Sequence, residues 1–315
     1  MTVRKAPRQD QQARPSPLTV WYGELTSPGR LRRRGLAFLL PGLLWILLFL
    51  VLPGLVVVVV SFASRGQYGQ IEWNFSFENY RRAAGNGILG WSADTLITLW
   101  RSVLVAFFTT LVSVLLAYPL AFLIASRPPR HRYLWLTLVI VPCWTNLVIR
   151  TYAWLLLLSP EFPFARLAAK LGLIDVGSGL YPSLFAIYLG MISAFLPFVV
   201  MPLYSSVERL DHSLVEAAQD LYGGRTRVFL HAILPQTLPG LTVGIITTFV
   251  PAMGMFLIPD LLGGGKELLI GNLIQQQFGS SRDWPYGAAL SLVLVVLTLI
   301  GLRVYRRYGK GVELA

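Results

Sequence analysis

The sequence predicts an all-α polytopic membrane protein with six transmembrane helices. Of its 315 residues, 55% are hydrophobic and only 13% are charged, about half the charged share of an average soluble domain. The mean hydropathy is +0.60. Six apolar runs are each long enough to cross the roughly 30 Å hydrocarbon core of a bilayer, and polar or basic segments separate them. These observations predict that most of the chain lies in a membrane.

The first apolar run, 36–62, follows a basic tail, 1–34, that is rich in Arg, Gln and Pro. This tail has the composition of a disordered segment. The run is much longer than the roughly 7–15-residue apolar core of a cleavable signal peptide, and no small-residue cleavage site follows it. It is therefore predicted to be the first span, and Pro41 and Pro53 predict bends in it.

The remaining spans follow from the same pattern of apolar runs. The segment 63–97 mixes aromatic and polar residues, which predicts an external loop with short interfacial helices. The segment 159–179 is predicted to be a loop with at most one surface helix. Pro142 interrupts the third run and Pro197 kinks the fourth. The expected spans, within a transmembrane domain 35–306, are 36–62, 98–125, 133–158, 180–204, 238–262 and 286–305.

The basic residues indicate which side of the membrane each loop faces. The net charge is +12, and Lys and Arg concentrate in the N-terminal tail, the loop at 127–132, the loop 207–235 and the C-terminal tail 307–315. The positive-inside rule places these segments, and both termini, in the cytoplasm. In a soluble protein this charge would suggest a nucleic-acid partner, but the positive-inside bias explains it better in a chain that lies in the lipid bilayer, and we expect no nucleic acid.

The loop 207–235 is a polar segment between two apolar runs. Ser213 and Glu216 have the spacing of a capping box, which predicts a helix start. Gly223-Gly224 ends this helix, because glycine adopts the left-handed conformation of a helix C-terminus. A second short helix is expected from about Thr226 until Pro235 starts the next span. The apolar face of the first helix consists of Leu214, Ala217, Ala218 and Leu221, at i, i+3, i+4 and i+7.

The residues Glu216-Ala217-Ala218 and the closing Leu234-Pro235 resemble the cytoplasmic loop of ABC importer permeases, which seats in a cleft of the ATPase subunit. Two positions depart from that pattern. Tyr222 holds the usual glycine position, with Gly223 one residue late, and the isoleucine expected directly before Leu-Pro is displaced to Ile233. The alternative is an amphipathic loop at the membrane surface.

Further blocks resemble permeases of the spermidine/putrescine type. They are 150–154, 196–211, 259–278 and 283–289, and with the loop they cover about half of the chain. The resemblance implies a type I ABC importer permease fold in the bacterial inner membrane. It also implies an ABC ATPase dimer that binds ATP and Mg, a second homologous permease and an external substrate-binding protein. The implied cargo is a polyamine or a related small cationic solute.

The resemblance also implies which residues contact the ATPase. Glu216, Arg225 and Arg227 are the expected polar contacts, and Leu221 and Phe229 are the expected apolar anchors. Alternatively, Glu216 only caps its helix, and the two arginines are membrane-surface charges. The full coupling set is Glu216, Ala217, Ala218, Leu221, Gly223, Arg225, Arg227, Phe229, Leu234 and Pro235.

Polar and aromatic residues within the spans are the candidates for a substrate pathway. Asn146 is expected near mid-membrane and Arg150 one turn farther out, paired, directed outward or acting as a gate. Asp260 could attract a cation or cap a loop, and aromatic rings could stack on an amine or form an interfacial belt. Pro251, Gly254 and Pro259 predict a discontinuous fifth span or packing kinks. The pathway candidates are Trp144, Asn146, Arg150, Tyr152, Met253 and Asp260.

No catalytic or metal-binding pattern accompanies these segments. The Lys266 that follows a glycine run precedes Glu267 and so forms no Walker A motif; ATP hydrolysis is therefore assigned to a partner, and no cofactor is expected in this chain. The single cysteine, Cys143, permits no disulfide within the chain. An ion-coupled secondary transporter is the alternative, for which inverted repeats and buried acids would be expected.

Overall fold

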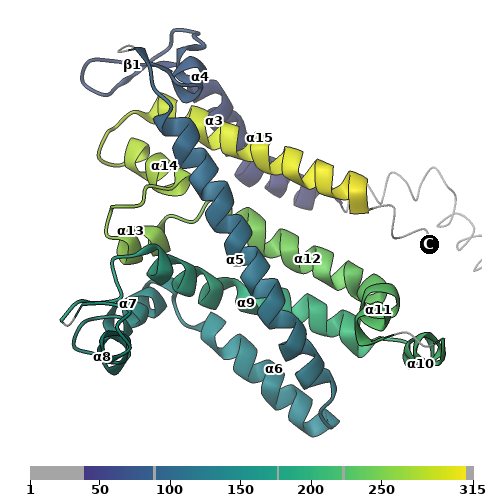
Figure 1. Cartoon of the computed structure of the whole chain (residues 1–315). Coiled ribbons are helices and arrows are strands. Elements are labelled where there is room, and N and C mark those ends of the chain that lie inside the picture. The colour runs from purple at the N-terminus through teal and green to yellow at the C-terminus, as the bar shows by residue number, and fades with distance from the viewer. Residues whose placement is uncertain (1–38, 88–89, 176, 222–223, 310–315) are drawn as a thin grey trace, which may run out of the picture. The chain divides into compact units, whose positions relative to one another are not determined.

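The computed structural model describes residues 39–309 except 88–89, 176 and 222–223, and it confirms the predicted all-α polytopic fold (Figure 1). The expected tail 1–34 and residues 310–315 lie outside the described residues. The chain forms two units, Met1–Val57 and Val58–Ala315. Among the described residues, five helices are long and apolar enough to cross a membrane, and one bent helix pair brings the number to six.

The first of these helices, Leu39–Val60, includes the π turn η1 (Leu47–Val51) and α3 (Leu52–Val60). Nearly all of its side chains are apolar and exposed, as lipid contact requires. The N–H of Leu52 donates to the carbonyl oxygen of Leu47, and Pro53 follows directly. Because proline has no N–H and clashes with the carbonyl four residues earlier, a wider turn before it relieves the helix. The irregularity expected at Pro53 takes this form.

The second unit contains the other long helices and two short hairpins. β1 (Ser64–Arg65) pairs with β2 (Ile71–Glu72), and β3 (Asn86–Gly87) pairs with β4 (Gly90–Trp91); the sequence did not predict these strands. The short helices are α4 (Glu78–Ala83) and α8 (Pro163–Lys170). The long helices are α5 (Asp94–Ala125), α6 (Pro129–Trp144), α7 (Leu147–Leu157), α9 (Leu184–Glu208), α12 (Leu234–Met253) and α15 (Trp284–Gly309).

Helices α5, α9 and α12 form the centre of the second unit (Figure 1). Small residues bring α12 close to α9: a Cβ at Gly240 would collide with the carbonyl oxygen of Pro202, and a Cβ at Gly244 would lie 3.2 Å from the Cα of Val199. Buried Ala117 of α5 belongs to the same apolar cluster as Val199. Membrane helices associate through such close contacts because lipid supplies no hydrophobic force between them.

The expected third span, 133–158, consists of two helices. α6 ends at Trp144, α7 begins at Leu147, and the two axes are bent by 95°. Pro142 lies inside α6, so the prediction of an interruption at Pro142 was wrong in position. The chain leaves the helix at Thr145 instead, and Asn146 starts the next helix: its side chain accepts a hydrogen bond from the N–H of Val148 at 2.8 Å.

The expected fifth span, 238–262, is also divided. α12 ends at Met253, and α13 (Leu257–Gly263) and α14 (Ile270–Phe278) follow before α15. The side-chain amide of Asn272 on α14 donates to the carbonyl oxygen of Phe256 at 2.9 Å. This hydrogen bond joins the segment between α12 and α13 to α14. At the same end of the unit, Arg82 of α4 pairs with buried Asp283 at 3.0 Å, just before α15.

Candidate functional site

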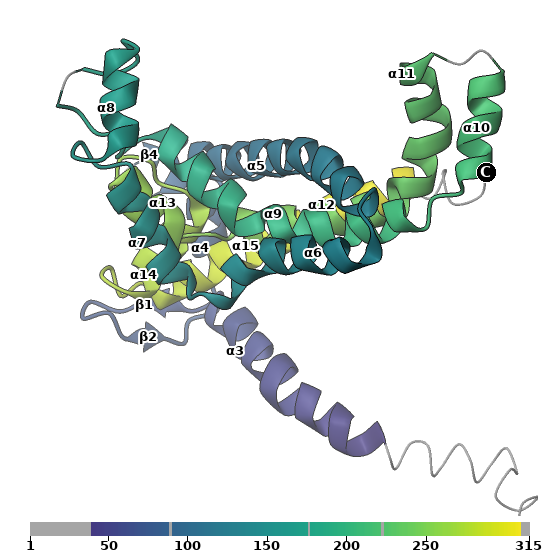
Figure 2. The ribbon, with the colours of Figure 1, turned by 90° about the horizontal axis from the view of Figure 1, so that it is seen from below.

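The loop between α9 and α12 contains α10 (His212–Asp220) and α11 (Arg225–Val228), which stand side by side (Figure 2). Asp211 caps α10: its Oδ1 accepts hydrogen bonds from the N–H of Ser213 at 2.9 Å and from the Ser213 hydroxyl at 2.7 Å. The predicted capping box of Ser213 and Glu216 was therefore wrong. Asp211, two residues earlier, offers a carboxylate to the first free N–H groups of the helix.

These hydrogen bonds also affect the ionisation of Asp211. The Ser213 hydroxyl and then the Ser213 N–H stabilise the carboxylate and lower the pKa of Asp211 below its ordinary value. The cap is thus negatively charged at neutral pH, at the helix end where the backbone dipole is positive.

Gly224 does not end α10 in the predicted left-handed conformation. Its φ is −61°, and it is the N-cap of α11. The C-cap of α10 is Leu221, with φ −76° and ψ 23°. Gly223, the other half of the predicted stop, lies outside the described residues.

α10 exposes the apolar face predicted from its residue spacing. Leu214 and Ala217 are exposed, Leu221 is 83% exposed, and Ala218 is half-buried. Val215, which lies beside this face, packs against the apolar cluster at the end of α9. Glu216 is exposed and makes no hydrogen bond or ion pair with any described residue. An exposed apolar face on a short loop helix is typical of a surface that contacts a partner protein or the membrane surface.

The second half of the loop is not a separate short helix. α11 continues through the π turn η2 (Phe229–Ile233) into α12, so one helix extends from Arg225 to Met253. The prediction that Pro235 separates the loop helix from the next span was therefore wrong. The π turn ends just before Pro235, as η1 does before Pro53, and accommodates the missing N–H without breaking the helix.

The loop is attached to the core through α5. The hydroxyl of Tyr118 lies 3.0 Å from Thr237 Oγ1, and the ring of Phe229 packs edge-to-face on Tyr118 with centroids 5.5 Å apart. Phe229, an expected anchor for a partner, thus contacts its own chain. Arg225 and Arg227 are exposed, and neither forms an ion pair with a described residue. Of the remaining coupling residues, Leu234 is half-buried and Pro235 is exposed.

Most of the predicted pathway residues lie around the two helix breaks. Trp144 ends α6 and is exposed, Asn146 caps α7, and Tyr152 is exposed on α7. Asp260 is exposed in the first turn of α13. Met253 is only 2% exposed and belongs to the apolar core between α9 and α13, so its side chain faces no open space in this structure.

Arg150 is the unusual member of this group. Its Nε and Nη1 are buried and have no hydrogen-bond partner among the residues that the structure describes. The ion pair that was one expectation for Arg150 is therefore not found within this part of the chain. One turn along α7, Trp154 donates its indole N–H to Ser193 Oγ at 2.8 Å, which fixes α7 to α9.

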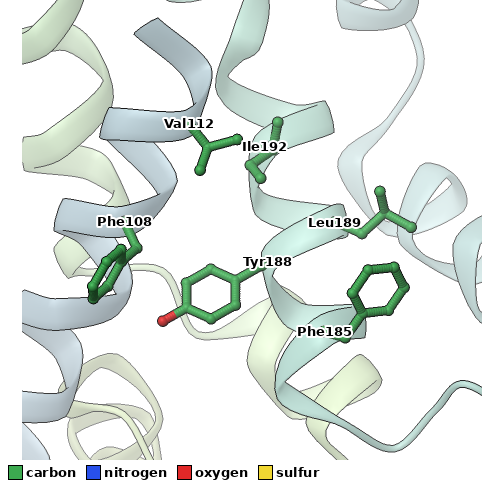
Figure 3. A pocket seen from close by; sticks show the side chains of 6 residues that line it. All are labelled: Phe108, Val112, Phe185, Tyr188, Leu189 and Ile192. Atoms are coloured by element: carbon green, nitrogen blue, oxygen red, sulfur yellow. The ribbon is translucent and has the colours of Figure 1, made fainter. Parts of the chain in front are cut away.

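An apolar groove of about 460 Å³ lies between α5 and α9. The rings of Phe108 and Tyr188 meet there edge-to-face at 6.4 Å, and the Tyr188 hydroxyl is the one polar side-chain atom of the lining (Figure 3). The groove offers ring faces to a cation but no carboxylate. Nothing in the sequence marks these residues, because they are ordinary apolar positions of two spans. The lining residues are Phe108, Val112, Phe185, Tyr188, Leu189 and Ile192.

Comparison with known proteins shows relatives along nearly the whole chain. The family described as "binding-protein-dependent transport system inner membrane component" matches residues 36–314. The chain is 39% identical to the spermidine/putrescine transport system permease protein PotB of Escherichia coli (strain K12), over 86% of this chain and 97% of that protein. It is 35% identical to the protein of the same name in Haemophilus influenzae, over 84% of this chain and 91% of that protein.

The fold also matches solved structures. The crystal structure of a bacterial ABC transporter that imports the acidic polysaccharide alginate aligns with a TM-score of 0.63 at 17% identity, over 91% of this chain and 99% of that chain. A complex of a bacterial alginate ABC transporter with a periplasmic protein bound to an alginate pentasaccharide aligns with a TM-score of 0.61. The chain therefore has the type I permease fold and belongs to the family of inner membrane components of binding-protein-dependent transport systems.

Proposed function

We propose that this chain is a transmembrane permease subunit of an ATP-driven importer for polyamines, such as spermidine and putrescine, or a related small cationic solute. The observation that carries the proposal is the exposed apolar face of α10 on a capped helix fixed to the core, in a chain of this family. Such a face suits a docking partner, and an ATPase subunit is the partner that a permease without its own nucleotide site needs. The names of the relatives support the cargo.

The basic residues support the orientation. Arginines lie at those ends of α5, α6, α9 and α11 that adjoin the loop 207–235. The positive-inside rule assigns this side of the membrane to the cytoplasm. With an even number of spans, both termini lie on the same side. These arginines are Arg127, Arg130, Arg132, Arg209, Arg225 and Arg227.

The proposed mechanism alternates between two states. ATP binding draws two ATPase subunits together, and each moves the α10 of one permease. Because α9 and α12 pack closely at Gly240 and Gly244, they tilt as a rigid pair. A pathway between this chain and a second homologous permease then opens to one side at a time. The ATPases bind ATP and Mg, and an external binding protein delivers the solute.

The helix breaks are the proposed lining of the pathway. Where helices are discontinuous, backbone carbonyl groups are free to contact a cation, and the exposed rings of Trp144 and Tyr152 add aromatic faces. Asn146 and Asp260 lie at the starts of α7 and α13. Arg150 would repel a cationic solute, which suits a gate rather than a binding group.

The test is uptake in proteoliposomes that contain this chain, an ATPase, a second permease and a binding protein of the spermidine/putrescine type. We expect spermidine uptake that requires ATP, and a loss of at least about tenfold with Leu221→Asp, the scale of a central interface residue. Leu173, which follows α8 and is 73% exposed, gives the matched variant Leu173→Asp, which should leave uptake unchanged. Uptake driven by an ion gradient without ATP would instead establish a secondary transporter.

A further inference from the structure

The N-terminal cap of α10 is completed by a residue of another helix. In a capping box, a Glu or Gln at the third helical position accepts a hydrogen bond from the N–H of the cap residue. In α10 the cap residue is Asp211 and the third helical position is Leu214, which has no acceptor. The N–H of Asp211 instead donates to Oε1 of Gln236 on α12, 25 residues later, at 2.9 Å.

Both polar atoms of the Gln236 side-chain amide form hydrogen bonds. Nε2 donates to the carbonyl oxygen of Ala232 at 2.9 Å, one turn earlier on the same continuous helix. The neighbouring Thr237 hydroxyl contacts the carbonyl oxygens of Ile233 and Leu234, both at 3.1 Å, as well as Tyr118 of α5. Since donor and acceptor of the Gln236 amide are both used, its orientation is set and the bond to Asp211 is directional.

This bond provides a direct route from α10 to α12. α10 is joined covalently to α9 at Leu210-Asp211, but along the chain it reaches α12 only through the rest of the loop. We propose that Gln236 is a positioning residue that transmits the movement of α10 to α12, so that both core helices follow the ATPase together. The inference rests on the proposed function, in which α10 docks on an ATPase.

The experiment uses Gln236→Met, which keeps the length of the side chain and removes both hydrogen bonds. We expect assembly with the ATPase and ATP hydrolysis to remain, while spermidine uptake per ATP hydrolysed falls about two- to tenfold, the range of one or two hydrogen bonds. Gln236→Glu retains an acceptor for the Asp211 N–H but loses the donor to the carbonyl oxygen of Ala232, so it should restore this ratio only in part. Gln276→Met, an exposed glutamine of α14, is the matched control and should equal wild type.

A second measurement needs no ATPase. Spin labels at Gln219 of α10 and Val243 of α12, in a Cys143→Ser background, should give a narrow distance distribution that broadens with Gln236→Met. If Gln236→Met takes up as much spermidine per ATP hydrolysed as the wild type, the role of Gln236 is overturned while the proposed function stands. A loss of uptake fully explained by lower thermal stability or poorer assembly overturns it too. A wild type that binds no ATPase overturns the proposed function, and this inference with it.

Discussion

Asp211 is the residue on which the start of α10 depends. Two hydrogen bonds from Ser213 hold its carboxylate and lower its pKa. A pKa lowered by folding means that the cap contributes stability above the ordinary Asp value of about 4 and loses it as the pH falls through the lowered pKa. At neutral pH the contribution is complete.

The pH prediction can be followed through the carboxyl group itself. The ¹³C NMR signal of labelled Asp211 should titrate below the value of the same residue in an unfolded peptide. Ser213→Ala, which removes the hydroxyl donor, should raise the midpoint, whereas Ser205→Ala, on α9 and away from the cap, should not. A midpoint in the folded chain equal to that of the peptide would show that the carboxylate does not cap the helix.

At the residue scale, spacing predicted which side chains α10 exposes but not which residue caps it. Ser213 and Asp211 are both good N-cap residues, and the glutamate three positions after Ser213 favoured the wrong one. Asn146 shows the same ambiguity: its capping preference is visible in the sequence, yet an apolar run with Pro142 nearby favours a kink there. The competing local signals were resolved only by the fold.

Among the helices, the contact of α12 with α9 depends on Gly240. A Cβ at this position meets the Ser206 hydroxyl and the carbonyl group of Pro202, and the latter is backbone that cannot rotate away. Gly240→Ala should therefore destabilise the protein by about 1–3 kcal/mol through overpacking. Thermal unfolding of the purified chain in detergent measures the loss.

Gly301 of α15 is the control for this substitution, because a Cβ there has no neighbour within 4 Å. Gly301→Ala should be neutral or stabilise the helix by up to about 1 kcal/mol, since alanine is the better helix former. Equal thermal midpoints for the two variants would contradict the close packing of α12 on α9.

Hydropathy predicted the long helices, and prolines predicted an interruption of the third run and, as one alternative, a discontinuous fifth span, but not where the backbone turns. The expected second span, 98–125, corresponds to α5 (Asp94–Ala125), and the sixth, 286–305, lies within α15. The third and fifth spans are each two helices, because a run of apolar residues looks the same whether or not the backbone turns within it. The π turns before Pro53 and Pro235 likewise keep helices continuous where proline predicted a bend or an end.

For the whole molecule, composition and charge were sufficient to predict a polytopic membrane protein. Short sequence motifs were sufficient to predict its family. A helical loop at 207–235 was also predictable from the sequence, while its role as a site remains a prediction. The bond from Asp211 to Gln236 was not, because it joins residues that only the packing of α10 against the start of α12 brings together. Nor did the sequence predict that Arg150 Nε and Nη1 are buried without a hydrogen-bond partner among the described residues.

The central claim is that the exposed face of α10 docks on an ATPase, and cross-linking tests it most directly. In a Cys143→Ser background, Leu221→Cys should cross-link to the ATPase subunit in the assembled importer, because this side chain is 83% exposed on the apolar face. Leu173→Cys, at a position after α8 that is 73% exposed, should not. An active complex in which Leu221→Cys yields no cross-link, or in which only Leu173→Cys does, would contradict the account.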